Sequence, residues 1–216
     1  MTCRLLVLFA WLTVSGLAAS CASNDLAEPR ELAGSQRAPL PQVNTATLPD
    51  VTNGGEPFEF VATEDGLLVV YFGYTNCPDV CPTTLADIRS ALRQIDESDA
   101  ARVKLAFATI DPNRDTAEII TGYSQFFVDN ASALRTTDPD ELRAAADLFG
   151  VVYSVEELGL DEDGNPAFDV VHSGFAYVVD DQGQLLVSWP FGIAAEDMAS
   201  DLEILFDQTR NAKEAS

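Results

Sequence analysis

The run Gly66-Leu-Leu-Val-Val-Tyr-Phe-Gly73, continued by Tyr74-Thr-Asn-Cys-Pro-Asp-Val-Cys-Pro82, contains the features that decide the fold. Its first half is short, unbroken, apolar and partly β-branched, which predicts a buried central strand. From residue 82 to residue 95 the apolar side chains recur at spacings of three and four, which predicts an amphipathic helix. Cys77 and Cys81 are therefore expected where a strand turns into a helix.

The spacing of the two cysteines indicates reactive or metal-binding thiols. Residues four apart on a helix face one side with Cβ atoms about 5–6 Å apart, so two sulfurs can bind one metal ion or approach disulfide geometry. The first turn of a helix also has free N–H groups and the positive end of the helix dipole, which favour thiolate over thiol. The alternatives are a buried, inert pair and a permanent small-loop disulfide.

The first 20 residues are typical of a secretory signal. Arg4 precedes an apolar stretch from Leu5 to Leu17, which is too short to span a bilayer as a permanent helix. Small residues then precede Cys21, as in a bacterial lipoprotein cleavage site, so Cys21 is the expected site of lipidation. Simple cleavage and an uncleaved anchor are the alternatives.

The remaining chain is expected to comprise a flexible tether and one folded domain. Residues 21–50 mix Ala, Pro, Ser, Asn and Glu with no period, which is typical of a tether. The domain is expected over residues 51–212. Because Cys3 is assigned to the signal, only Cys77 and Cys81 remain in that domain, and its stability must come from a core rather than from disulfides.

The chain is strongly acidic. It has 35 acidic and 12 basic residues, which give a formal net charge of −23 at pH 7. This excess disfavours nucleic acid and anionic membrane surfaces as electrostatic partners. A cationic partner, a saline habitat or simply a solvated acidic surface would each account for it.

The pattern along the domain predicts alternating strands and helices that end in a hairpin and a helix. This order is typical of an α/β, three-layer domain of thioredoxin type with a central mixed sheet. Asp115 or Thr116 is expected to cap the helix that follows, and Gly150 to end the next helix. The expected strands are residues 57–61, 66–73, 102–110, 172–179 and 184–189, and the expected helices are residues 82–95, 116–127, 140–149 and 198–206.

His172 is the only histidine in the chain. A lone histidine is usually a partly buried polar residue, but in a sheet of thioredoxin type this strand would begin across from the first turn of the cysteine helix. Two thiolates and one imidazole form a soft donor set that suits Cu(I), and the imidazole also allows Cu(II). A structural zinc site would need a fourth protein ligand, and none is evident in the sequence.

Three blocks of the sequence resemble the signature blocks of the SCO/SenC family, the copper-binding assembly factors of cytochrome c oxidase. They are residues 71–82, Asp111-Pro-Asn-Arg-Asp-Thr116 and Val171-His-Ser173, which follow the family's order. The similarity covers residues 55–210. Asp79 resembles a family position that tunes the site or contacts a partner, and its alternative role is that of a surface or capping residue.

The resemblance implies a thioredoxin-like fold and one copper ion with Cys77, Cys81 and His172 as its ligands. Val171 stands where members of the family usually have an aspartate, and Asp169 is the nearby carboxylate. A carboxylate directly before His172, which could orient its imidazole, is therefore missing from this sequence.

The resemblance implies a metallochaperone that delivers copper to the CuA centre of cytochrome c oxidase subunit II, with another periplasmic copper chaperone as a second partner. The alternative is a thiol–disulfide oxidoreductase in which Cys77 and Cys81 cycle between dithiol and disulfide and reduce an extracytoplasmic target. His172 distinguishes the two functions because copper binding requires it and a redox pair does not. The signal and Cys21 predict an extracytoplasmic protein anchored to the membrane by a lipid, on the periplasmic side in a Gram-negative bacterium.

Overall fold

The computed structural model describes residues 30–160 and 166–214. The predicted signal over residues 1–20, the predicted lipidation site Cys21 and the first part of the predicted tether lie outside these residues. The described residues from Glu31 onward belong to one compact unit. Among them, no helix combines the length and the apolar character that crossing a membrane requires.

A seven-stranded sheet organises this unit, in the order β2-β1-β5-β4-β3-β8-β9. Strands β3, β4 and β5 run parallel, whereas β8 pairs antiparallel with β3 and β9 antiparallel with β8. The sheet is therefore mixed, as predicted, and every residue of β3, an interior strand between β4 and β8, is buried. The strands are β1 (Thr47–Asp50), β2 (Glu56–Glu59), β3 (Leu67–Gly73), β4 (Val103–Thr109), β5 (Ser132–Leu134), β8 (Phe175–Val179) and β9 (Leu185–Pro190).

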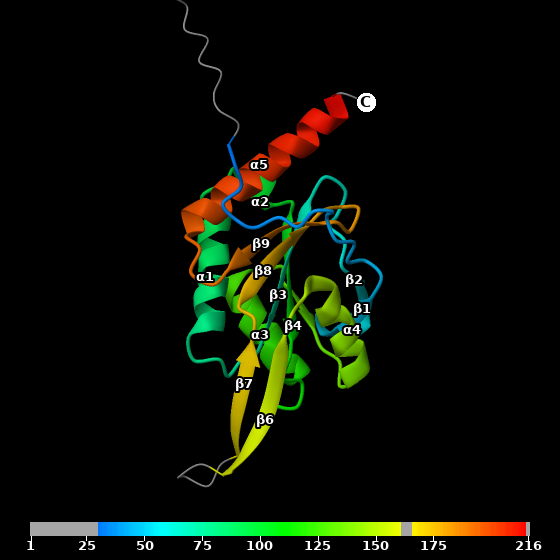
Figure 1. Ribbon diagram of the computed structural model, residues 1–216, viewed down its shortest axis with the longest axis vertical. Coiled ribbons are helices and arrows are strands. Elements are labelled where there is room, and N and C mark those ends of the chain that lie inside the picture. The colour runs from blue at the N-terminus through cyan, green and yellow to red at the C-terminus, as the bar shows by residue number, and fades with distance from the viewer. Residues whose placement is uncertain (1–29, 161–165, 215–216) are drawn as a thin grey trace, which may run out of the picture. The chain divides into compact units, whose positions relative to one another are not determined.

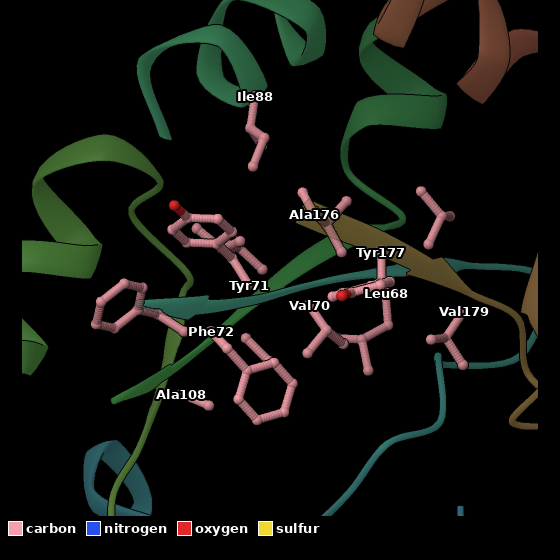
Figure 2. Close-up of a cluster of buried hydrophobic side chains, with 14 of the residues drawn as sticks. Leu68, Val70, Tyr71, Phe72, Ile88, Ala108, Ala176, Tyr177 and Val179 are labelled. Atoms are coloured by element: carbon pink, nitrogen blue, oxygen red, sulfur yellow. The ribbon is translucent and has the colours of Figure 1, made fainter. Parts of the chain in front are cut away.

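Helices cover both faces of the sheet, which confirms the predicted three-layer, thioredoxin-like arrangement (Figure 1). Tyr71 of β3 points to the face on which Ile88 of α1 lies (Figure 2). Its neighbour Phe72 points to the other face, where its ring centroid lies 5.4 Å from that of Phe149 in α4. The helices are α1 (Val80–Leu92), α2 (Glu97–Ala100), α3 (Ala117–Phe127), α4 (Pro139–Phe149) and α5 (Ala195–Glu214), with a 3-10 turn η1 (Val51–Asn53).

Two helix boundaries lie where the sequence predicted them. Thr116 precedes α3, and its hydroxyl accepts a hydrogen bond from the backbone N–H of Ile119 at 3.3 Å. Gly150 follows α4 in the left-handed conformation with φ of 74°, which glycine adopts without the steric cost of a side chain. Of the two predicted capping residues for α3, Thr116 is therefore the one that caps it.

A hairpin of β6 (Tyr153–Leu160) and β7 (Pro166–His172) forms a separate two-stranded sheet. Figure 1 shows this hairpin extending beyond the end of the seven-stranded sheet. The predicted single strand over residues 172–179 is wrong, because β7 ends at His172 and β8 begins at Phe175. The break follows from a change of partner, since β7 pairs with β6 whereas β8 pairs with β3 and β9.

The segment before β1 belongs to the folded domain, which corrects the predicted limits of the tether. The backbone N–H of Ser35 donates to the carbonyl oxygen of Ser188 at 2.9 Å, and the N–H of Ser188 donates back to Ser35 at 2.9 Å. The segment thus lies along β9, where its polar groups find partners. The folded domain consequently begins well before residue 51.

Candidate metal centre

The connection between β3 and α1 presents the two cysteines. β3 ends at Gly73 and α1 begins at Val80, so Cys81 lies in the first turn of the helix and Cys77 lies ahead of it. The four-residue spacing predicts two thiols on one face of a helix, which is wrong for Cys77 because it lies before α1. The two are nevertheless adjacent, because the backbone N–H of Cys81 donates to the Sγ atom of Cys77 at 3.3 Å. The sulfur thereby satisfies one of the free N–H groups of the helix terminus.

Both cysteine side chains are shielded from solvent, with Cys81 0% and Cys77 8% exposed. Burial raises the pKa of the Cys81 thiol to about 12, and a hydrogen bond with the Tyr74 backbone opposes this rise only in part. The sequence predicted that the helix terminus favours thiolate over thiol. At Cys81 burial works against this effect, because it removes the hydration that stabilises the charged sulfur.

His172 completes the site from the end of β7. Its Nε2 atom lies 3.6 Å from the Sγ atom of Cys81, and its Nδ1 atom lies 3.2 Å from the carbonyl oxygen of Ser173. A hydrogen bond to that carbonyl places the proton on Nδ1 and leaves the Nε2 lone pair facing the sulfur. Burial lowers the pKa of His172, and the bond to Ser173 partly opposes this effect. The imidazole is thus held in its neutral, metal-binding form.

Two tyrosines enclose the imidazole, a contact that the sequence argument missed. The ring centroids of Tyr71 and Tyr74 lie 6.3 Å and 5.8 Å from that of His172, and both rings meet it edge-on. Burial raises the pKa of both hydroxyls, to about 12 for Tyr74. Within the described part of the chain, the buried hydroxyl of Tyr71 has no hydrogen-bond partner of good geometry, although Cys81 and Thr84 lie close to it. Their place in the first signature block was the available signal, but the sequence alone does not show that they meet the histidine.

The structure brings the three candidate ligands together. One donor atom from each of Cys77, Cys81 and His172 lies within 4.8 Å of the other two. The two nearby carboxylates do not join this group: Asp79 is exposed and makes no capping hydrogen bond, and Asp169 is exposed on β7. The group that orients the imidazole is consequently a backbone carbonyl and not a carboxylate.

A residue of the second signature block, Asp115, binds the loop that carries Cys77. Asp115 is 0% exposed, and its carboxylate accepts hydrogen bonds from the backbone N–H of Thr75 at 3.1 Å and from its hydroxyl at 2.5 Å. The hydroxyl of Thr109 donates to the same carboxylate at 2.6 Å. Thr75 lies two residues before Cys77, so the buried carboxylate fixes the loop that carries this thiol. From the sequence, Asp115 is predicted only as a candidate helix cap.

A cavity of about 460 Å³ opens beside the candidate ligands. Cys77 and His172 line it, together with the exposed apolar side chains of Val171 and Phe191. Cys81 is fully buried and does not line the cavity. The site is therefore reached from the side of Cys77 and His172.

The fold and the site together define a thioredoxin-like domain with a Cys-Cys-His group at the start of its cysteine helix. The SCO1/SenC family model matches residues 50–207. The chain belongs to this family, which confirms the resemblance seen in the sequence. A SCO2-like protein of Rickettsia typhi is 30% identical over 148 residues, which cover 68% of this chain and 70% of that protein.

Solved structures of the family have the same fold. Apo Sco1 from Thermus thermophilus is 27% identical with a TM-score of 0.69, and the match covers 81% of this chain and 97% of that one. Bradyrhizobium japonicum ScoI with copper bound is 28% identical with a TM-score of 0.58, and the match covers 73% of this chain and 95% of that one.

Proposed function

We propose that this protein is a copper-binding metallochaperone for the assembly of the CuA centre of cytochrome c oxidase. The observation that carries the proposal is the convergence of two thiols and one neutral imidazole, whose donor atoms lie within 4.8 Å of one another. Cys77 comes from the loop after β3, Cys81 from α1 and His172 from β7. The site therefore exists only in the folded chain.

The donor set fits copper. Thiolates are soft ligands that suit Cu(I), and imidazole also accommodates Cu(II). Ligand bonds of about 2.0–2.3 Å to one ion allow two donors to lie at most about 4.6 Å apart, so small side-chain shifts would close the site. Among the described residues the group holds three donors, one fewer than a structural zinc site uses. The copper-bound ScoI of Bradyrhizobium japonicum, at 28% identity, supports the same choice of metal.

The cavity beside the site suits a protein that passes its ion on. Incoming thiol or imidazole ligands can approach Cys77 and His172 first, with Cys81 as the last ligand to be replaced. The exposed apolar side chains of Val171 and Phe191 on the cavity wall offer a surface for a protein partner. We propose the CuA domain of cytochrome c oxidase subunit II as the acceptor and another periplasmic copper chaperone as the source.

The proposed location is extracytoplasmic, with the chain anchored to the membrane through a lipid on Cys21. The support for this location is the sequence of the signal and the small residues that precede the cysteine. Growth of cells with labelled palmitate should label the wild-type chain and leave Cys21→Ser unlabelled. A wild-type chain that takes up no label would contradict the lipid anchor.

Copper binding by the full chain tests the metal site. We expect one copper per chain, and loss of tight Cu(I) binding in Cys77→Ser and in Cys81→Ser, because each variant removes one of three donors. His172→Ala should weaken binding, and Val171→Ala, which changes the exposed neighbour on the same strand, should bind as the wild type does. Stoichiometric copper in either serine variant would contradict the assignment.

Copper transfer tests the delivery role separately. The loaded chain should transfer its copper to an isolated, copper-free CuA domain of subunit II, and the transfer is measured as copper in each protein after separation. A chain that binds copper and keeps it in the presence of that domain would contradict delivery and leave the metal site intact.

Thiol–disulfide exchange is the second candidate function. The observation in its favour is that Cys77 and Cys81 are both free thiols, adjacent in the structure, with Cys77 on the cavity wall. Reduction of an oxidised CuA domain by the metal-free chain would support it, provided that His172→Ala retains the activity and Cys77→Ser loses it. The high pKa of the Cys81 thiol predicts slow attack by this sulfur, since the thiolate is the nucleophile.

A further inference from the structure

The hairpin that carries His172 is not part of the seven-stranded sheet. Among the described strands, β6 and β7 pair only with each other. The hairpin extends beyond the end of the main sheet (Figure 1), so the hydrogen bonds of that sheet do not fix its position. The placement of the imidazole therefore depends on the two-residue link to β8 and on the side chains that attach the hairpin to the domain.

Arg114 makes one of these attachments. It lies in the second signature block, where its Nε atom pairs with the carboxylate of Asp111, a side chain that is 2% exposed. This ion pair aims the guanidinium at two aromatic rings. Its Cζ atom lies 4.2 Å from the ring centroid of Phe168 and 5.9 Å from that of Tyr74, both within cation–π range.

Both rings are connected to the imidazole of His172, one through the strand and one by direct contact. Phe168 and His172 lie on the same face of β7, because residues four apart on a strand point to the same side, and both are partly buried. The ring of Tyr74 meets the ring of His172 edge-on, with 5.8 Å between the centroids. Arg114 thus contacts both the strand that carries the imidazole and a ring that packs against it.

We propose that Arg114 is a positioning residue for His172. Through Phe168 and Tyr74 it holds the hairpin so that the imidazole Nε2 atom faces the sulfur of Cys81. The effect of Arg114 on copper binding rests on the proposed function. The Nη2 atom of Arg114 is buried and has no hydrogen-bond partner among the described residues, so the aromatic faces are the groups there that stabilise this part of the guanidinium.

A second arginine attaches the other strand of the hairpin. The Cζ atom of Arg143 in α4 lies 4.1 Å from the ring centroid of Tyr153, and its Nη2 atom lies 3.5 Å from the carbonyl oxygen of that residue. Tyr153 is the β6 residue that pairs with His172. Because this attachment remains when Arg114 is replaced, we expect the hairpin to shift without unfolding.

NMR spectroscopy of the metal-free full chain tests the placement without copper, because His172 is the only histidine. The wild type should show a nuclear Overhauser contact between the rings of Tyr74 and His172. Arg114→Leu should lose it and shift the imidazole signals, whereas Arg114→Lys keeps the cation and should restore it in part. Arg93→Leu changes an exposed arginine at the end of α1 and should match the wild type.

Copper affinity gives the second readout. Arg114→Leu and Phe168→Leu should each weaken Cu(I) binding by about tenfold in chelator competition, the size expected from loss of one partly buried cation–π contact. The double variant should lose no more than Arg114→Leu alone, since that variant already removes the contact with Phe168. Phe168→Tyr keeps the ring face and should bind as the wild type does. Phe168 lies outside the hydrophobic core, so its variants test the contact even if Arg114→Leu fails to fold.

The outcomes separate this proposal from the proposed function. Unshifted imidazole signals in a folded Arg114→Leu chain would overturn the role of Arg114, and so would additive losses in the double variant. A wild-type chain that binds no copper would overturn the proposed function, while the metal-free spectra would still decide whether Arg114 positions His172.

Discussion

The Nε2 atom of His172 lies 3.6 Å from the Sγ atom of Cys81, although the two residues are 91 positions apart in the chain. This contact joins two differently supported parts of the molecule. Cys81 belongs to α1, which packs on the main sheet, whereas His172 belongs to a hairpin that pairs only within itself among the described strands. A small movement of the hairpin therefore changes the distance from the imidazole to the sulfurs while the sheet stays intact.

The imidazole of His172 should carry its proton on Nδ1 in the metal-free chain. The carbonyl oxygen of Ser173 lies 3.2 Å from that nitrogen and accepts the proton's hydrogen bond, which leaves Nε2 free to bind a metal. Long-range ¹⁵N–¹H correlation spectra distinguish the two tautomers, and His172→Ala identifies the signals by removing them. A proton on Nε2 would contradict the orientation described, because a protonated nitrogen has no lone pair for a metal.

Gly73, the last residue of β3, leaves room for the sulfur of Cys81. A Cβ atom at this position would lie 3.0 Å from that sulfur and 2.9 Å from the ring of Tyr71. Gly73→Ala should therefore displace the sulfur, weaken copper binding and lower the free energy of unfolding by about 1–3 kcal/mol, the usual cost of overpacking. Denaturant unfolding and chelator competition measure the two effects.

Gly122 provides the matched control for this change. It lies inside α3, and apart from its chain neighbours and the nearby backbone of that helix, a Cβ atom there would meet no described atom within 4 Å. Gly122→Ala should raise the free energy of unfolding by about 0.5–1 kcal/mol, because alanine is the better helix former. A Gly73→Ala chain as stable as Gly122→Ala would show that the sulfur is not confined as described.

The main elements of the fold were predictable because their sequence patterns reflect burial. The apolar run of β3 is buried on both faces of the sheet, and α1 buries Leu85 and Ile88 at the predicted spacing. The hairpin β6–β7 was not predicted. It projects from the sheet, and apolar residues such as Leu158 and Leu160 are 65% and 69% exposed. The order of apolar and polar residues along β6 therefore does not follow from contact with a core.

The candidate ligands were predictable from residue type, but their surroundings were not. Two thiols and a single histidine are conspicuous in any reading, and the structure brings their donor atoms within 4.8 Å. The burial of Cys81 depends on the ring of Tyr71 and the missing side chain of Gly73, which come from another element. Such contacts are set by tertiary packing, which local periodicity does not encode.

Asp115 should be required for the conformation of the cysteine loop. Its buried carboxylate accepts three hydrogen bonds, two from Thr75 and one from Thr109. Asp115→Asn replaces one acceptor oxygen by a donor amide, so at least one of the three donors loses its acceptor and the remaining bonds lose a charged partner. The free energy of unfolding should fall by about 2–3 kcal/mol, the cost of leaving a buried polar group unpaired. Asp129→Asn, at an exposed position, is the control and should change stability by less than about 0.5 kcal/mol. Equal stability of the two variants would show that the Asp115 carboxylate does not hold the loop.

Asp201 of α5 should hold the segment before β1 on the domain. This side chain is 0% exposed and accepts hydrogen bonds from the backbone N–H groups of Ala33 at 2.7 Å and Gly34 at 2.9 Å, and from the indole N–H of Trp189 at 2.8 Å. Asp201→Ala leaves these donors without their acceptor and should lower the free energy of unfolding by about 3 kcal/mol.

Limited proteolysis of the same variant tests whether this segment is domain or tether. In the wild type, the hydrogen bonds of Ser35 with Ser188 and of Asp201 with residues 33 and 34 should protect the chain from cleavage there. Asp201→Ala should be cleaved faster at this place, whereas Asp197→Ala, which changes an exposed acid in the first turn of the same helix, should be cleaved as the wild type is. Rapid cleavage around residue 35 in the wild type would contradict this attachment and would support a tether that extends to residue 50, because proteases cleave unattached segments readily.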